Sequence, residues 1–120
     1  MKALFDSVIL IDYLNGITAA RVEIARYDAA LVSPINWMEV MVGVSAAEEP
    51  VVRRFLARFG QVAVDEHIAE LAVELRRRHR LRLPDAVVWA SARHAGALLV
   101  TRNTRDFPDD DPGVRVPYRL

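Results

Sequence analysis

The stretch Leu81–Phe107, LRLPDAVVWASARHAGALLVTRNTRDF, decides the fold and raises the first chemical question about this chain. Pro84 is typical of a helix start and Gly96 of a helix end, so we expect a helix between them. The apolar run ALLV that follows predicts a strand. Asp85 lies at the start of this helix, and Asp106 lies shortly after the strand. A carboxylate that faces a packed core is costly unless a cation meets it, so both positions need a partner.

The rest of the chain repeats this alternation of short apolar runs and helical segments. We expect strands at residues 2–5, 29–33, 61–64, 97–100 and 114–116, and helices at residues 8–16, 18–27, 34–47, 50–60, 66–80 and 84–96. Alternation of this kind is typical of a mostly parallel sheet covered by helices on both faces. No linker or repeat interrupts it. The sequence therefore predicts one α/β domain over residues 1–120, a three-layer α/β/α sandwich with four to five strands.

Particular residues mark the expected helix ends. Ser33 followed by Pro34 is a strong helix start, and Asp65 is a candidate N-cap for the helix that follows it. Thr18 is expected to cap the second helix, and Gly60 to close the helix that begins at Pro50.

Composition limits the function classes. The chain has 120 residues, of which 52% are hydrophobic and 27% charged, and its formal net charge is zero. These values are typical of a soluble globular domain. The absence of cysteine excludes disulfides, thiolate nucleophiles and cysteine zinc sites. Asp6 comes too early for a signal peptide, and no apolar run approaches the roughly 20 residues that a membrane span needs. We expect a cytoplasmic protein without a membrane segment.

Four carboxylates are expected at the carboxyl edge of the sheet, where α/β folds place their ligands. Asp6 follows the first strand, which we expect to be central, and Glu39 lies in the helix after the second strand. Asp85 and Asp106 flank the fourth strand. Each alone has a simpler explanation: a helix cap, a solvent-facing side chain, a carboxylate at a helix dipole, or a turn residue.

Together the four acids point to a metal site. Carboxylates gathered in one cleft repel one another and raise each other's pKa, and a divalent cation removes that conflict. Oxygen ligands suit Mg²⁺ or Mn²⁺, and such a site can activate water and neutralise a phosphoryl group. On the helix of Glu39, we expect the bulky stripe Ile35, Met38 and Val42 to face the core.

Three segments carry a resemblance to a known family: MKALFDSVILIDYLNG (1–16), VSPINWMEVMVG (32–43) and the stretch 81–107. With the spacing between them, they resemble PIN-domain proteins, and more closely the VapC-type toxins of bacterial toxin–antitoxin pairs. The resemblance covers essentially the whole chain. It implies a Mg²⁺- or Mn²⁺-dependent endoribonuclease that leaves a 5′-phosphate and a 3′-hydroxyl. It also implies a homodimer and a cognate antitoxin, a small DNA-binding protein.

The family's acidic residues fall on matching positions of this chain. The resemblance assigns catalysis to Asp6, Glu39, Asp85 and Asp106, and metal binding to Asp6, Asp85 and Asp106, with Asp6 and Asp85 as the firmest direct ligands. Ser7 and Asn103 match polar positions that line the family's site.

One position departs from the family pattern. Two residues after Asp6, where the family usually carries a small polar residue, this chain has Val8. Metal binding is expected to survive this change, and activity is expected to be weaker unless a water fills the gap.

Arginines are the candidates for phosphate contact. Arg102 and Arg105 flank the expected site and are the better candidates. The run 75–82, LRRRHRLR, is either a solvated helix face or an RNA-binding surface, because helical spacing spreads consecutive arginines around the axis.

Three other functions were weighed. A phosphorelay receiver domain needs a lysine after its last strand, and this chain has no lysine after Lys2. A catalytically impaired PIN-fold binding module would be consistent with Val8, although four mutually repelling carboxylates argue against it. A nuclease of the same fold that acts on DNA or in RNA maturation stays open.

Overall fold

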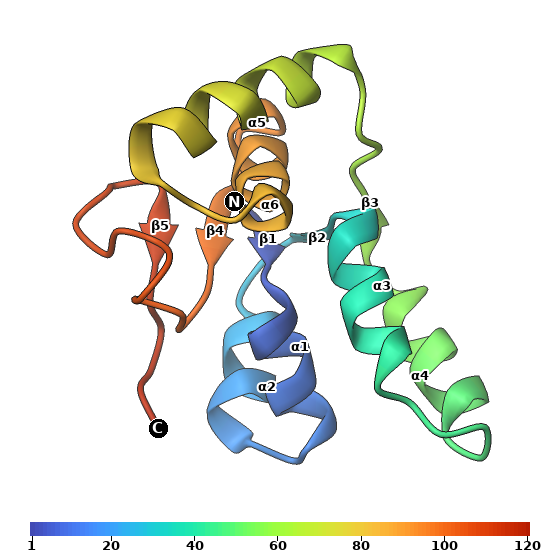
Figure 1. Cartoon of the computed structure of the whole chain (residues 1–120). Coiled ribbons are helices and arrows are strands. Elements are labelled where there is room, and N and C mark those ends of the chain that lie inside the picture. Colours follow the sequence, from blue (N-terminus) through green and yellow to red (C-terminus); the bar gives the residue numbers. More distant parts are fainter.

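The structure, a computed structural model, describes all 120 residues as five strands and six helices. The strands form one parallel sheet in the order β3-β2-β1-β4-β5, so the first strand is central (Figure 1). Their bounds are Lys2–Phe5 (β1), Ala29–Val32 (β2), Gly60–Gln61 (β3), Leu98–Val100 (β4) and Val114–Arg115 (β5). The expected mostly parallel sheet and its central first strand are both confirmed.

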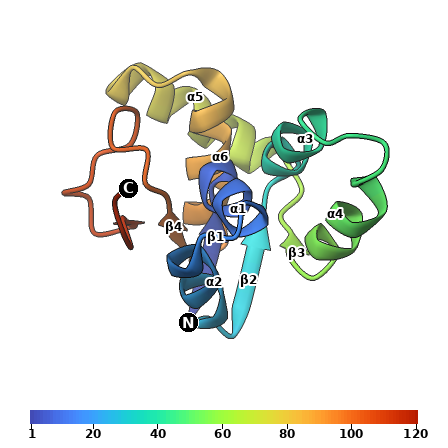
Figure 2. The same cartoon turned by 90° about the horizontal axis from the view of Figure 1, so that it is seen from below.

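Helices connect the strands and cover the sheet on two sides. They are α1 (Ser7–Leu14), α2 (Thr18–Ala25), α3 (Pro34–Val42), α4 (Glu49–Leu56), α5 (Glu66–His79) and α6 (Leu83–His94). Figure 2, seen from below, shows α1 and α2 in front and α5 across the top of the view. None of the helices combines the length and the apolar character that crossing a membrane requires.

The core is divided into two clusters by the sheet. Ala3 and Phe5 of β1 pack with buried residues of α1, α2, α3 and α4. Leu4, between them, packs with residues of α5 and α6. Successive side chains of a strand point to opposite faces, so this split is what a sheet between two helical layers produces. The three-layer α/β/α sandwich is confirmed.

Several local signals act as expected. Ser33 caps α3: its Oγ accepts a hydrogen bond from the Ile35 amide, and Asn36 Oδ1 accepts one from the Ser33 amide, which completes a capping box. Asp65 caps α5 by accepting from the Ile68 amide at 2.9 Å. Gly96 has a φ of +65°, which glycine tolerates, just after α6 ends.

Other local predictions are wrong. The helix expected at 34–47 ends at Val42, because Gly43 takes the C-cap position. Thr18 is the first residue of α2 and Ile17 occupies its N-cap position. Gly60 does not close a helix: α4 ends at Leu56, and Gly60 begins β3. A Cβ at Gly60 would lie 2.8 Å from Leu31 Cδ2, so a larger residue here would require the Leu31 side chain to shift.

The expected core stripe of α3 is also wrong in part. Met38 is 51% exposed and Val42 is 89% exposed, whereas Asn36 and Val40 are buried. The hydrogen bonds of the polar residue Asn36 explain this orientation of α3. Asn36 donates from Nδ2 to the Ser7 hydroxyl at 3.2 Å, as well as closing the capping box. These bonds turn the Asn36 face of α3 inward and leave two large apolar side chains in solvent.

Candidate active site

The structure brings the four predicted acids to one groove at the carboxyl edge of the sheet. Asp6 directly follows β1, Glu39 lies in α3, Asp85 in the first turn of α6, and Asp106 in the loop after β4. The groove has a volume of about 260 Å³. It is lined by Asp6, Ser7, Val8, Glu39, Arg82, Pro84, Asp85, Asn103 and Asp106. Convergence of these segments is therefore a property of the fold, while the role of each residue stays a prediction.

Asp6 is the most buried of the acids, with 6% of its surface exposed. Its carboxylate accepts hydrogen bonds from the Ser7 amide at 2.9 Å, as N-cap of α1, and from Thr101 Oγ1 at 2.8 Å. Burial raises the pKa of Asp6 to about 6. The two hydrogen bonds lower this pKa, and the negative charges of Asp85 and Glu39 raise it by a smaller amount. At neutral pH this carboxylate is an anion that its surroundings disfavour.

Thr101 is expected at the carboxyl edge of the sheet, but its hydrogen bond to Asp6 is not predicted from the sequence. It follows β4 directly and is fully buried. β1 pairs with β4 so that Phe5 lies opposite Val100, which places Thr101 beside Asp6. The contact itself depends on the register of two strands that lie nearly a hundred residues apart in the chain.

Asp85 is half-buried at the opposite wall of the groove. Burial raises its pKa to about 6, and the negative charges of Asp106 and Glu39 add to this effect. Arg82, the N-cap residue of α6, works against it. Arg82 therefore lines the groove as well. The sequence does not indicate which arginine of the run 75–82 would lie near the acids.

The remaining polar side chains are held by short hydrogen bonds. The Ser7 hydroxyl donates to Glu39 Oε1 at 2.6 Å and accepts from Asn36. Asn103 donates from Nδ2 to Asp106 Oδ2 at 2.8 Å, and its amide donates to Thr101 Oγ1 at 3.0 Å. Ser7 and Asn103 thus each donate a hydrogen bond to one of the four acids, and their supporting role stays a prediction.

A second groove adjoins the first and is richer in positive charge. Its volume is about 630 Å³, and its lining includes Val8, Arg82, Arg105 and Asp106. Arg82 and Val8 line both grooves. Arg102 also lines the second groove, but its guanidinium is already bound to the buried carboxylate of Asp12 at 2.6 and 2.9 Å. Arg105 and Arg82 have no such partner and are free to contact an anion.

The donor set fits a hard divalent cation. All four acids offer carboxylate oxygens, which Mg²⁺ and Mn²⁺ prefer. Burial, with a smaller effect of the neighbouring carboxylates, raises the pKa of Asp6 and of Asp85, and a cation in the groove would favour their charged forms. As the side chains stand, no three acids are close enough together to hold an ion by themselves. Water molecules usually complete the shell of a Mg²⁺ ion, so fewer direct protein ligands suffice.

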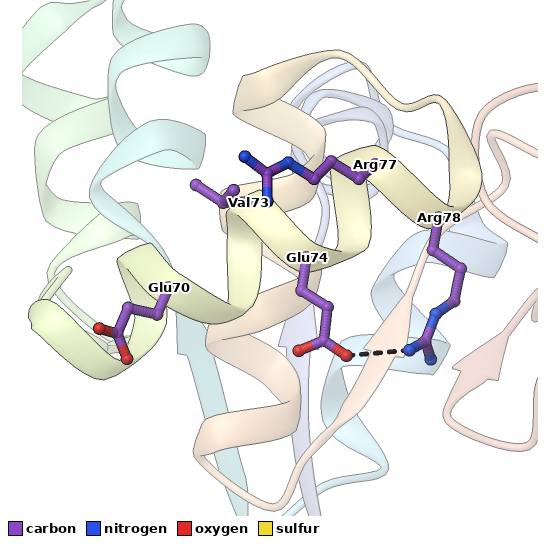
Figure 3. A pocket seen from close by; sticks show the side chains of 5 residues that line it. All are labelled: Glu70, Val73, Glu74, Arg77 and Arg78. Carbon is purple, nitrogen blue, oxygen red and sulfur yellow. Dashed lines mark hydrogen bonds and ion pairs between the residues drawn. The ribbon is translucent and has the colours of Figure 1, made fainter.

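A further hollow lies over α5 and has a different character. Figure 3 shows its five lining side chains, Glu70, Val73, Glu74, Arg77 and Arg78, all from this one helix. Glu74 and Arg78 form an ion pair at 3.0 Å, both more than half exposed. Neighbouring charges one turn apart are typical of a solvated helix face. This hollow brings no distant segments together.

Comparison with known proteins identifies the class to which this fold and groove belong. A family model for the PIN domain matches residues 3–109. Ribonuclease VapC10 from Mycobacterium tuberculosis is 35% identical over 113 residues, which cover 88% of this chain and 85% of that protein. The chain therefore belongs to the PIN-domain family and, within it, to the VapC ribonuclease toxins of toxin–antitoxin pairs.

Solved structures agree with this placement. A toxin–antitoxin complex from Klebsiella pneumoniae contains a chain 40% identical to this one, with a TM-score of 0.92 over 98% of this chain and 99% of that one. VapBC2 from Rickettsia felis, bound to a DNA fragment from its promoter, has a TM-score of 0.76 at 20% identity, over 95% and 96% of the two chains. At 20% identity, the similarity to the Rickettsia felis protein shows only that the two chains share a fold. PIN-domain nucleases are generally metal-dependent.

Proposed function

We propose that this chain is a Mg²⁺- or Mn²⁺-dependent endoribonuclease, the toxin of a toxin–antitoxin pair whose cognate antitoxin inhibits it. One observation carries the proposal. Asp6 and Asp85, both with a pKa raised to about 6, face one groove together with Glu39 and Asp106. A metal ion compensates such a group of carboxylates, and the adjoining arginines offer a place for the phosphates of RNA.

The reaction is hydrolysis of an RNA phosphodiester. The oxygen of water forms a bond to phosphorus, the bond from phosphorus to the 3′-oxygen breaks, and the products are a 5′-phosphate and a 3′-hydroxyl. A bound Mg²⁺ or Mn²⁺ would neutralise charge on the phosphoryl group and lower the pKa of water. Asp6, Asp85 and Asp106 are the residues that would hold it.

The other side chains of the groove position the reacting groups. Thr101 and the Ser7 amide fix the Asp6 carboxylate, and Asn103 fixes Asp106. Glu39 is exposed, and its carboxylate accepts a hydrogen bond from the Ser7 hydroxyl, so we assign it the acceptance of a proton from the attacking water. Arg82 and Arg105 bind the phosphates on either side of the bond that breaks.

A groove between α1, α2 and α4 supports an antitoxin as partner. Tyr13 stacks on Phe55 with ring centroids 4.4 Å apart, and Arg21 lies over the Tyr13 ring at 4.9 Å. The groove is lined by Tyr13, Leu14, Arg21, Val51, Arg54, Phe55 and Arg58. An aromatic floor with three arginines fits an amphipathic helix that carries acidic residues. We assign this groove to such a segment of the cognate antitoxin.

Val8 favours one alternative, a catalytically impaired PIN-fold binding module. Its side chain lines both grooves at a position where the family usually carries a small polar residue. If Val8 is the cause of impairment, Val8→Asn raises the rate of RNA cleavage. The four retained acids and their hydrogen bonds favour the active enzyme.

RNA cleavage by the purified, antitoxin-free protein tests the proposal. Total RNA would be incubated with Mg²⁺, with Mn²⁺ and with EDTA, beside Asp6→Asn, Asp85→Asn and the matched control Asp110→Asn in an exposed turn. Discrete cleavage that needs metal, is lost in the first two variants and persists in the control would support the proposal. Absence of cleavage by folded wild-type protein with every metal would favour the binding module.

A further inference from the structure

Asp12 is a buried carboxylate that the reaction described above does not use. It lies on α1, it does not line the groove of the four acids, and its side chain is 5% exposed. It accepts three hydrogen bonds: from Arg102 Nε at 2.6 Å, from Arg102 Nη2 at 2.9 Å and from the Tyr118 hydroxyl at 2.7 Å. The pKa of Asp12 is lowered, chiefly by the hydrogen bonds from Arg102 and against the effect of burial. The group is therefore a fixed anion.

These contacts join three distant segments of the chain at one point. Arg102 begins the loop that follows β4, Tyr118 lies in the segment after β5, and Asp12 belongs to the N-terminal helix. Bidentate binding of a guanidinium fixes its orientation as well as its position. Because a buried carboxylate loses little to solvent screening, this contact is stiffer than a surface ion pair.

The loop that Arg102 begins is part of the candidate active site. Its ends are anchored by the fully buried Thr101 and by Phe107, which is 1% exposed. Between them lie Asn103 and Asp106, which hydrogen-bond to each other within the loop. Arg102 is the residue of 102–106 whose side chain hydrogen-bonds outside the loop. Residues 102–106 themselves form no regular helix or strand.

We propose that Asp12 is a positioning residue for RNA cleavage: with Tyr118 it holds Arg102, and through Arg102 it holds the loop that carries Asn103 and Asp106 against the groove. This inference rests on the proposed nuclease function. It gives Arg102 a different role from the RNA contact predicted from the sequence. It also makes the segment after β5 part of the site's support, because the Tyr118 hydroxyl donates to the same carboxylate that binds Arg102.

The chain contains a matched control for this arrangement. Glu23 on α2 is a carboxylate that is 4% exposed, bound by Arg115 at 2.7 and 3.0 Å and by the Tyr27 hydroxyl at 2.6 Å. Burial, a bidentate arginine and a tyrosine hydroxyl are thus the same in both. The Arg115 side chain ties β5 to α2 and does not reach the loop that carries Asn103 and Asp106.

The experiment compares Asp12→Asn and Tyr118→Phe with Glu23→Gln. Two quantities are measured under conditions where each variant is folded: RNA cleavage with Mg²⁺ or Mn²⁺, and deuterium exchange of the amides of residues 102–106 in EDTA. We expect Asp12→Asn to lower kcat by about 10- to 100-fold with a smaller change in KM, in line with other residues that orient a ligand. In the same variant, deuterium exchange of the amides of residues 102–106 should become faster. Tyr118→Phe shows the same effects to a smaller degree, and it serves if Asp12→Asn does not fold.

The outcomes separate this proposal from the proposed function. Glu23→Gln should lower the melting temperature as much as Asp12→Asn but leave cleavage and loop exchange close to wild type. Unchanged loop exchange in both Asp12→Asn and Tyr118→Phe, or equal loss of activity in Glu23→Gln, overturns the positioning role. If wild-type protein itself does not cleave RNA, the proposed function fails, and the exchange measurement still decides whether Asp12 holds the loop.

Discussion

Asp6 and Asp85 couple the groove to the stability of the fold. In the folded protein the pKa of each is raised to about 6 from an ordinary value of 3.8. Between about pH 4 and pH 6, the folded state therefore binds more protons than the unfolded state. Stability falls as pH rises wherever that holds, so the two groups contribute most below pH 4 and their contribution is lost as pH approaches and passes 6.

We therefore expect metal-free protein to resist urea less at pH 7 than at pH 5. Below about pH 4, protonation of Asp12 and Glu23, whose pKa values are lowered, removes stability again. The measurement is the free energy of unfolding in EDTA at pH 5, 6 and 7, with the double variant Asp6→Asn, Asp85→Asn as control. The control should show a much weaker dependence. A wild-type protein that gains stability between pH 5 and pH 7 would contradict the shifts.

Arg82 and Arg105 should carry RNA binding in the second groove. Because each would displace one counterion from single-stranded RNA, we expect Arg82→Gln or Arg105→Gln to reduce the salt slope of binding by about 0.7. Binding of a labelled RNA to cleavage-deficient Asp6→Asn protein, over a range of salt concentrations, measures this slope. Arg77→Gln on the outer face of α5 is the matched control (Figure 3). An equal effect there would place RNA on α5 instead.

At the scale of elements, the start of α3 both stabilises the helix and supports a residue of the candidate active site. Asn36 closes the capping box of α3 and donates to the Ser7 hydroxyl, which in turn donates to Glu39. This buried amide also explains why α3 presents Met38 and Val42 to solvent. A sequence pattern of apolar spacing cannot foresee that outcome, since the deciding partner, Ser7, lies on another helix.

Asn36→Ala should lower the free energy of unfolding by about 1–3 kcal/mol, the sum of a lost cap and a lost buried hydrogen bond. It should also slow RNA cleavage, because the Ser7 contact to Glu39 loses its support. Denaturant unfolding and a cleavage assay measure the two effects. Asp65→Ala, which removes the N-cap of α5 outside the groove, should also lower the free energy of unfolding but leave cleavage unchanged. Equal slowing in both variants would mean that the effect follows stability alone.

At the scale of the whole molecule, partners are expected to cover the apolar surface. Charge reversal at the groove between α1, α2 and α4, as Arg21→Glu with Arg54→Glu, should weaken binding of the cognate antitoxin by at least about tenfold and reduce its salt dependence. Titration calorimetry with purified antitoxin measures this, with Arg77→Glu as control. Unchanged affinity would exclude this groove as the antitoxin-binding site.

The homodimer stays a prediction. Met38 and Val42 on α3 are exposed apolar candidates for its interface. Light scattering of the purified protein would then show the mass of two chains.

The sequence by itself determined the order of strands and helices, the parallel α/β sandwich and the position of the four acids at one edge of the sheet. These follow from local signals such as Pro84, Asp65 and the apolar runs, together with the rule that parallel strands end at the same edge. The tertiary structure decided which residues meet there. Thr101 reaches Asp6 through strand register, Arg82 enters the groove with the start of α6, and the Arg102 guanidinium binds Asp12. Each depends on segments far apart in the chain, whose relative placement comes from packing and hydrogen bonding across the sheet.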